Sequence, residues 1–350
     1  MTPASPSETI ATAIKRNRAG APALPDLDLD VGVTPRDLIH TNGTARLFRY
    51  RPVVDEVYRT PVLLVPSLVS RPYILDLAEG QSLVGFLLQR GFDVYLVDWG
   101  TPRAEHSGMA LEDYVLRLLP ESVEIVVRES DVEDVSLIGY CLGGQLACMY
   151  AATHCDGPLR NLACFTTPIN SDGMRLYQTW TDSSHFDLDD IVKELGNIPP
   201  ELISAPLQAL RPFQQTAGQL RLLQRVGDDE FVKASLRLDR WAADQVPVAG
   251  EAARQLVTEF LRENKLVRNQ MRLASQRVDF GSIRTPFLHV AAQHDHVVPR
   301  ESSKDLLGLI GSDDKAEIVI KGGHVSLVAG GNAVYRLWPQ VDRWLSVRSI

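Results

Sequence analysis

A cysteine flanked by glycines is the residue of this chain best suited to covalent chemistry. Cys141 lies in the segment GYCLGG (139–144), which joins an apolar run to a stretch of small residues at helical spacing. A sharp strand-to-helix turn admits only small flanking residues, projects its central side chain above a sheet, and offers backbone N–H groups to an oxyanion. These features favour a nucleophile, although a buried thiol that behaves as a small hydrophobe is the alternative interpretation.

An acid and a histidine follow later apolar runs. Asp295 ends the run in FLHVAAQHD and His324 ends the run in EIVIKGGH, and the interval between them leaves room for one helix and one strand. In a catalytic triad the histidine deprotonates the nucleophile and the acid orients the histidine. Nucleophile, acid and histidine in this chain order are typical of α/β-hydrolases. Taken singly, Asp295 also fits an Asx turn and His324 a polar loop residue, but together with Cys141 they predict a triad.

Four further residues are candidates around this triad. The backbone N–H of Leu142, directly after the nucleophile, and that of Val69 (or its neighbour Leu68), in the loop after an early strand, are predicted to stabilise an oxyanion. His296 and Trp241 are candidates for substrate binding, with packing in the core as the alternative for Trp241. No histidine or carboxylate stands at zinc-ligand spacing from His296, so we predict no metal and no cofactor.

Alternating apolar and amphipathic stretches indicate how these residues are positioned. Continuous apolar runs such as TPVLLVPSLV, FDVYLVDWG and DVSLIGY are typical of strands buried on both faces of a parallel sheet. Helical patterns with short connections separate these runs, which indicates a doubly wound, mostly parallel α/β sheet. Strand patterns resume at TPFLHVAAQHD and KAEIVIKGGH, and a helical pattern closes the chain.

A helical insertion interrupts this sheet. Residues 172–280 show helical patterns without a convincing buried strand between them. We therefore predict an α/β-hydrolase fold with a core formed by residues 34–171 and 281–350 and a helical cap formed by residues 172–280. Residues 1–33, rich in Pro, Ala, Ser and Asp, are predicted to form a loosely attached N-terminal arm.

The composition narrows the class of protein. The chain has 350 residues, 45% hydrophobic and 23% charged, and its formal net charge of −8 disfavours nucleic acid as a partner, because phosphate binding needs a basic face. No apolar run is long enough to span a membrane or resembles a signal-peptide core, so we expect a cytoplasmic protein. The four cysteines form no CxxC pair, which argues against a structural zinc site, and Cys148 is predicted to be a core residue.

Several longer motifs resemble one family. The segments DVYLVDWGTP, GYCLGGQLACMYAATH, GNIPPELI, HDHVVPRESSK and GGHVSL are similar to those of the catalytic subunit of two-component (class III type) polyhydroxyalkanoate synthases. The resemblance implies that Cys141 carries the acyl group, that His324 is its general base, and that Asp295 is the third catalytic residue. The chain differs from the usual family pattern around the nucleophile at Ser70, Leu142, Gln145 and Ser326.

The resemblance also implies a reaction and partners. The expected reaction is polymerisation of (R)-3-hydroxyacyl-CoA, with 3-hydroxybutyryl-CoA as the expected short-chain monomer, and release of CoA. The expected partners are a separate helical subunit, further copies of this chain in a homo-oligomer, and polyester granules. Cysteine suits this chemistry, because acyl transfer from a thioester to a thiol is nearly isoenergetic, whereas the later attack by a 3-hydroxyl is downhill to an oxoester.

Some alternatives stay open on the sequence alone. An ester or thioester hydrolase, or a non-polymerising acyltransferase, would use the same scaffold and triad. A non-catalytic granule-associated subunit is a third interpretation, which the complete triad disfavours. Asp295 either orients His324 or helps to activate the attacking hydroxyl.

Overall fold

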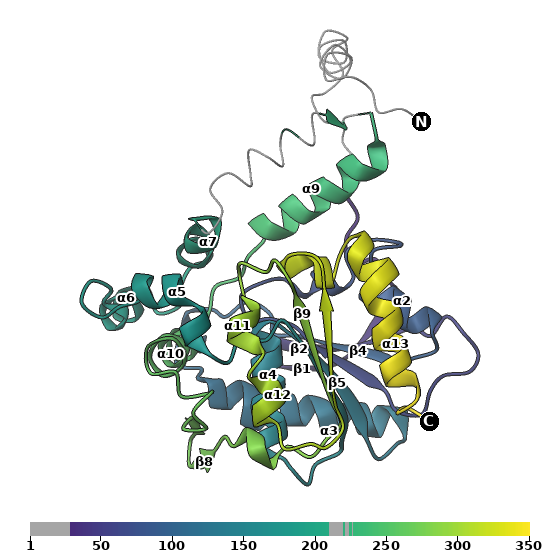
Figure 1. The fold of residues 1–350 in the computed structure, drawn as a ribbon, viewed down its shortest axis with the longest axis horizontal. Coiled ribbons are helices and arrows are strands. Elements are labelled where there is room, and N and C mark those ends of the chain that lie inside the picture. Colours follow the sequence, from purple (N-terminus) through teal and green to yellow (C-terminus); the bar gives the residue numbers. More distant parts are fainter. Residues whose placement is uncertain (1–28, 210–219, 221–223, 226) are drawn as a thin grey trace.

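A sheet of eight strands forms the centre of the molecule in the part of the chain that the structure describes (Figure 1). The computed structural model describes residues 29–209, 220, 224–225 and 227–350. The strand order is β1-β2-β4-β3-β5-β6-β9-β10. β2 pairs antiparallel with both β1 and β4, and all other pairs are parallel. The bounds are β1 (Arg36–Asn42), β2 (Ala45–Tyr50), β3 (Val62–Val65), β4 (Val94–Asp98), β5 (Val135–Tyr140), β6 (Leu159–Phe165), β9 (Phe287–Ala292) and β10 (Lys315–Ile320).

The central strands are apolar because both of their faces are covered. Every residue of β3, β4 and β5 is buried, as expected for parallel strands between two layers of helices. The edge strand β10 instead alternates exposed and less exposed residues, because only one of its faces packs against the core. The mostly parallel sheet predicted from the apolar runs is confirmed.

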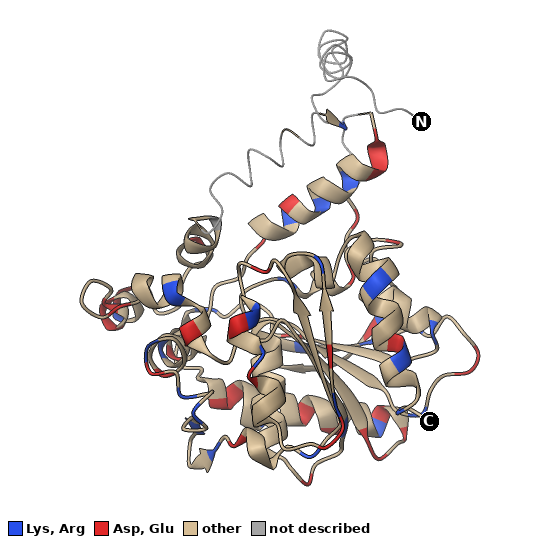
Figure 2. Ribbon diagram, in the orientation of Figure 1, with Lys and Arg blue, Asp and Glu red and all other residues tan. Residues whose placement is uncertain are grey.

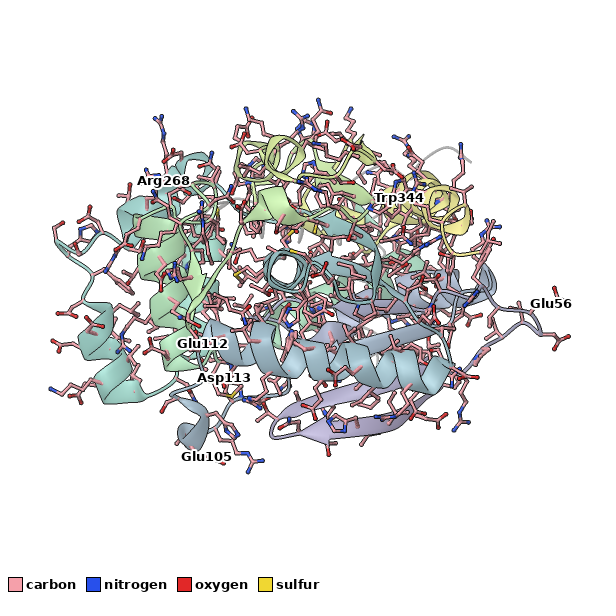
Figure 3. All side chains as sticks on the ribbon, turned by 90° about the horizontal axis from the view of Figure 1, so that it is seen from below. Glu56, Glu105, Glu112, Asp113, Arg268 and Trp344 are labelled. Atoms are coloured by element: carbon pink, nitrogen blue, oxygen red, sulfur yellow. The ribbon has the colours of Figure 1, made fainter. Side chains whose placement is uncertain are left out.

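Helices cover both faces of the sheet, and each face has its own apolar cluster. On one face lie the π-helix η3 (Asp113–Leu118) and the helices α3 (Leu119–Ser130), α4 (Leu142–Thr153) and α12 (Leu306–Leu309). On the other lie α2 (Leu83–Gln89), the π-helix η8 (Ala333–Leu337) and α13 (Trp338–Ser346). Figure 3 places Asp113 of η3 and Trp344 of α13 on opposite sides of the sheet. The sheet is therefore the middle layer of three.

The insertion predicted as a cap carries helices in its described residues. They are α5 (Arg175–Trp180), α6 (Leu188–Leu195), α7 (Pro200–Ala209), α9 (Asp229–Ala243), α10 (Gly250–Gln255) and the π-helix η5 (Leu256–Arg262). A hairpin of two short strands, β7 (Arg272–Leu273) and β8 (Gln276–Arg277), follows these helices. It was not predicted from the sequence. In Figure 1, α9 lies beyond the ends of β9 and β10. The boundaries of the cap stay a prediction.

Polar contacts join the insertion to the core at α10. Gln255 donates to the Glu112 carboxylate at 2.9 Å and accepts from the Leu111 N–H at 2.6 Å, on the side of the molecule where Figure 3 labels Glu112. Figure 2 shows both basic and acidic residues along α9, whereas α4 carries neither.

Short elements complete the chain between the longer helices and strands. They are the 3₁₀ helices η1 (Pro72–Leu75), η2 (Ala104–His106), η4 (Ser171–Gly173), η6 (Phe280–Ser282) and η7 (His324–Leu327), and the short helix α11 (Arg300–Ser303). Most of the predicted arm, residues 1–33, lies outside the described residues. Among the described helices, none combines the length and the hydropathy that a membrane span requires.

Candidate active site

Cys141 lies in the turn between β5 and α4, where the sequence predicted it. Its φ of 56° and ψ of −123° are unusual for a residue with a side chain. Its N–H donates to the Phe165 carbonyl at 2.9 Å, which fixes the turn against the neighbouring strand β6. Only 8% of the residue is exposed. A strained backbone that the surrounding structure holds in place is a feature of functional sites.

None of the three glycines of this turn has room for a Cβ where its neighbours now lie. A Cβ at Gly139 would lie 2.5 Å from the Gly144 Cα. A Cβ at Gly143 would overlap the Val65 carbonyl oxygen, and one at Gly144 would overlap the Thr167 hydroxyl. Each glycine therefore lets a different segment approach: Gly139 the start of α4, Gly143 the end of β3, and Gly144 the loop after β6.

His324 and Asp295 meet at the same edge of the sheet. The Nδ1 atom of His324 lies 2.8 Å from Oδ2 of Asp295, whose side chain is fully buried. The same carboxylate oxygen accepts from the Thr166 hydroxyl at 2.5 Å. The other oxygen accepts from the N–H groups of Val297 and Val298 at 2.9 and 2.8 Å. Four donors thus hold the Asp295 carboxylate. The contact between this carboxylate and His324 requires a proton on Nδ1 of His324.

Neighbouring charges and hydrogen bonds shift the pKa values of His324 and Asp295. Burial opposes the charged form of His324, but the negative charges of Asp295 and Cys141 and the hydrogen bonds to both outweigh it and raise the pKa of His324 to about 10. Burial likewise opposes ionisation of Asp295, yet the charge of His324 and the hydrogen bonds from His324, Thr166 and Val298 lower the pKa of that carboxyl. Since Nδ1 faces Asp295, Nε2 is the atom that faces the thiol. The imidazole of His324 thus lies between the Asp295 carboxylate and the Cys141 thiol.

The loop after β3 lies against the start of α4, as an oxyanion site requires. The absent side chain of Gly143 lets the carbonyls of Val65 and Pro66 approach the first turn of α4. The Leu142 N–H belongs to that turn and has no carbonyl four residues earlier within the helix. Val69 lies in the same loop and is half-buried. The roles of Leu142 and Val69 as oxyanion donors stay predictions.

Comparison with known proteins places the chain in a family. Residues 60–330 match the α/β hydrolase fold, and residues 25–87 match the N-terminal part of poly-beta-hydroxybutyrate polymerase (PhaC). A poly(3-hydroxyalkanoate) polymerase subunit PhaC from Allochromatium vinosum is 34% identical over 91% of this chain and 90% of its own length. The chain belongs to the PhaC family.

Other PhaC relatives extend this comparison. The Synechocystis subunit is 32% identical over 92% of this chain and 86% of its own length, and the Haloferax mediterranei subunit is 32% identical over 92% of this chain. The chain spans 66% of the Haloferax relative's length.

Solved structures of more distant proteins share the fold. An esterase from Thermogutta terrifontis has a TM-score of 0.55 at 16% identity, over 90% of this chain and 99% of the esterase. A monoacylglycerol lipase from Paleococcus ferrophilus has a TM-score of 0.51 at 17% identity, over 86% of this chain and 99% of the lipase. The α/β-hydrolase fold predicted from the sequence is confirmed.

In this PhaC chain, a tyrosine that sequence reasoning missed lies near Cys141 and Asp295. The hydroxyl of Tyr177, in α5, donates to the Val297 carbonyl at 3.1 Å. Burial raises the pKa of Tyr177, and the nearby negative charges of Cys141 and Asp295 raise it further. Tyr177 therefore ties the insertion to the loop that carries Asp295. The helical pattern around it carries no signal for this contact.

The two candidate substrate-binding residues lie in different surroundings. Trp241 is 9% exposed, packs in the same apolar cluster as Cys141, and donates from Nε1 to the Arg71 carbonyl at 3.0 Å. His296 is exposed, next to Asp295 in the chain. Trp241 thus belongs to the apolar cluster that includes Cys141, whereas His296 lies at the surface. Binding of substrate by either residue stays a prediction.

The other cysteines differ from Cys141 in their surroundings. Cys148 is fully buried, as predicted, and its Sγ lies 3.3 Å from that of Cys164. The hydrogen bond with Cys164, together with burial, raises the pKa of the Cys148 thiol. Cys155 is exposed. Within the described ranges, no group of three or more His, Cys, Asp and Glu side chains is arranged to hold a metal ion.

Proposed function

We propose that this PhaC-family chain polymerises (R)-3-hydroxyacyl-CoA through an acyl group bound to Cys141. The observation that carries the proposal is the nucleophile turn itself: a cysteine at a strained β5–α4 turn, beside a histidine whose pKa is raised to about 10. The names of the relatives as poly(3-hydroxyalkanoate) polymerase subunits support the reaction. We propose 3-hydroxybutyryl-CoA as the monomer.

Acylation is the first step. Nε2 of His324 takes the proton of the Cys141 thiol, and the resulting thiolate attacks the thioester carbonyl. The N–H groups of Leu142 and Val69 stabilise the oxyanion that forms. When the tetrahedral intermediate collapses, a bond from Sγ to the acyl carbon replaces the bond to the CoA sulfur. The His324 imidazolium gives its Nε2 proton to the departing CoA thiolate. One thioester replaces another, so the step is nearly isoenergetic.

Elongation is the second step. Acylation removes the negative charge of Cys141, which is one of the contributions that raise the pKa of His324. Imidazole is then the available base, and its Nε2 takes the proton of the 3-hydroxyl of another monomer or chain end. The hydroxyl oxygen attacks the acyl carbon, the bond to Sγ breaks, and the thiolate–imidazolium pair returns.

Asp295 acts as the residue that orients His324 in this proposal. Its side chain is fully buried, and four hydrogen bonds occupy its two oxygens. A hydroxyl of the substrate would have to displace one of these donors before Asp295 could take its proton. The contacts therefore support orientation of the imidazole rather than direct activation of the hydroxyl.

Partners and location follow from the same proposal. Several relatives are named as polymerase subunits, which supports a separate partner subunit, and we propose that it is helical and that the chain forms a homo-oligomer. A cytoplasmic enzyme with a growing polyester chain on Cys141 would remain attached to its product granule.

The test uses purified protein, 3-hydroxybutyryl-CoA and variants of two cysteines. Wild type is expected to release CoA and form insoluble polymer, and Cys141→Ala to do neither. Cys155→Ser is the matched control, since that thiol is exposed, and it should keep full activity. Release of free 3-hydroxybutyrate without polymer would instead identify a thioesterase. CoA release by Cys141→Ala would overturn the proposed nucleophile.

A further inference from the structure

A short segment at the end of α9 lies along the loop that carries Val69. We call residues 241–246 the strap and residues 66–71 the oxyanion loop. Ser70 and Gln245 form an antiparallel bridge, and the Val246 N–H donates to the Val69 carbonyl at 3.3 Å. The strap thus pairs with the oxyanion loop through a short antiparallel backbone contact.

Side chains of the strap extend this pairing by one residue. The Trp241 indole N–H donates to the Arg71 carbonyl at 3.0 Å. The Arg71 guanidinium in turn donates to the Asp244 carboxylate at 3.2 Å. Trp241, Val246 and Ser70 are buried, whereas the Arg71 and Asp244 side chains are 32% and 41% exposed. An ion pair with that exposure contributes little, so the buried contacts to the loop backbone are the stronger part of the strap.

The core holds the opposite end of the oxyanion loop. The Trp99 indole donates to the Pro66 carbonyl at 3.0 Å, and Gly143 packs against the same carbonyl. Between the two ends lies a cavity of about 10 Å³, lined in part by Ser67, Leu68, Asp98 and Val246. The position of Val69 therefore depends on the strap as well as on the core.

We propose that the strap positions the oxyanion loop for acylation, with Trp241 as a positioning residue rather than a contact for substrate. The inference rests on the proposed role of the Val69 N–H. Trp241 is part of α9, so a displacement of α9 moves the donor that holds the Arg71 carbonyl. Oxyanion donors act only when they are placed within a fraction of an ångström of the developing charge. The strap would thereby couple the state of the insertion to the chemical step.

The test compares two reactions of Cys141 in Trp241→Phe. Phenylalanine keeps an aromatic ring in the apolar cluster but lacks the N–H that holds Arg71. Acylation by 3-hydroxybutyryl-CoA, followed as the burst of CoA release, is expected to slow by about tenfold to a hundredfold, with KM little changed. Alkylation of Cys141 by iodoacetamide forms no oxyanion and is expected to proceed at the wild-type rate. The assays use a Cys155→Ser background, because Cys155 is exposed.

Controls separate the strap from general effects on the insertion. Asp189→Asn removes the negative charge from a contact with Arg254 within the insertion, at 2.7 Å. This contact does not touch the oxyanion loop, so the variant should leave both reactions unchanged. If Trp241→Phe does not fold, Asp244→Asn replaces it as the test variant. This substitution weakens the hydrogen bond from Arg71 at a half-exposed position, so it is expected to slow acylation by a smaller factor without changing alkylation.

Three outcomes would overturn the inference. The first is a folded Trp241→Phe that acylates at the wild-type rate. The second is an equal loss of acylation and alkylation, which would mean that Trp241 supports the nucleophile turn rather than the loop. The third is a raised KM with unchanged kcat, which would make Trp241 a substrate contact. Acylation of Cys141→Ala would refute the proposed function, whereas these results concern the strap alone.

Discussion

Replacing Asp295 by asparagine tests the orientation of His324 most directly. The carboxylate accepts hydrogen bonds on both oxygens: Oδ2 faces Nδ1 of His324 and the Thr166 hydroxyl, and Oδ1 faces the N–H groups of Val297 and Val298. An amide has one acceptor oxygen and one NH₂ group, so in either orientation its NH₂ must face groups that donate in the wild type.

The two orientations of the amide differ in cost. If the NH₂ faces Val297 and Val298, two buried backbone donors lose their acceptor, at about 1–3 kcal/mol each. If it faces His324, the Thr166 hydroxyl can rotate to accept and the imidazole can change tautomer, so that Nδ1 accepts. We expect the second orientation. Nε2 then carries the proton and points it at Cys141, and the histidine can no longer take a proton from the thiol.

The expected loss of rate follows from the wrong tautomer and the lost charge. A pKa raised from 6.5 to about 10 corresponds to about 5 kcal/mol of preference for the imidazolium, to which Asp295 and Cys141 both contribute. The corresponding change in a serine protease triad lowers kcat by about 10⁴-fold. We therefore expect acylation and elongation in Asp295→Asn to fall together, by about 10³–10⁴-fold, or about 4–5.5 kcal/mol of barrier.

A single-turnover assay with radiolabelled 3-hydroxybutyryl-CoA separates the two steps. Acid quenching traps the acyl-enzyme, and the polymer is counted separately. Asp314→Asn is the matched control, because its carboxylate pairs with Arg348 at the surface, and it should behave as wild type. Acyl-enzyme that forms at the wild-type rate in Asp295→Asn but does not elongate would refute the orienting role. It would show instead that Asp295 activates the hydroxyl.

Three further predictions concern stability and the insertion. The free energy of unfolding lost in His324→Gln should be largest below pH 6.5 and should shrink as the pH rises towards about 10, because a raised pKa stabilises only the protonated form. Urea denaturation at several pH values measures this loss, and a cost independent of pH would contradict the ion pair. Gly144→Ala should destabilise the protein by about 1–3 kcal/mol, since the new Cβ would lie 2.9 Å from that of Thr167 as well as overlapping its hydroxyl. Thr167→Ala should partly restore the loss in thermal denaturation, and Gly308→Ala, with open space around it, should have little effect. Hydrogen exchange should be faster in the described residues of 172–280 than in β4 and β5, and a cognate partner subunit should slow it and raise turnover. Full activity of the isolated chain with a protected insertion would contradict this regulation.

The turn that carries Cys141 could be predicted from the sequence, because a glycine-flanked cysteine between an apolar run and a helical pattern is a recognisable local motif. Small residues on both sides of the central residue are typical of this sharp turn, so the pattern indicates it. The sequence does not show that Gly143 packs against the end of β3 and Gly144 against the loop after β6. Asp295 and His324 follow buried strands, and the carboxyl ends of parallel strands lie at one edge of a sheet. Their contact at 2.8 Å then follows from the fold.

The parts that were missed depend on contacts between residues far apart in the chain. Tyr177 and Val297 are 120 positions apart, and Trp241 and Arg71 are 170. Hydrophobic periodicity predicts that α5 and α9 are helices, but not which loop each one meets. The same limit applies to the segment ESSKDLLGLIG, whose sequence has one helical pattern but whose residues are divided between two short helices, α11 and α12. Apolar spacing does not locate such a break.

Burial of the triad bears on the choice between polymerisation and hydrolysis. Once Cys141 is acylated, an imidazole able to deprotonate a 3-hydroxyl is equally able to deprotonate water, so basicity alone cannot favour polymer. Access decides between the two nucleophiles, and only 8% of Cys141 is exposed. Tyr177 and Trp241 link the insertion to the loops on either side of the nucleophile. A displacement of the insertion that admits water would also break the contacts that hold the oxyanion loop. Acyl transfer from Cys141 would therefore slow whenever water gains access to it.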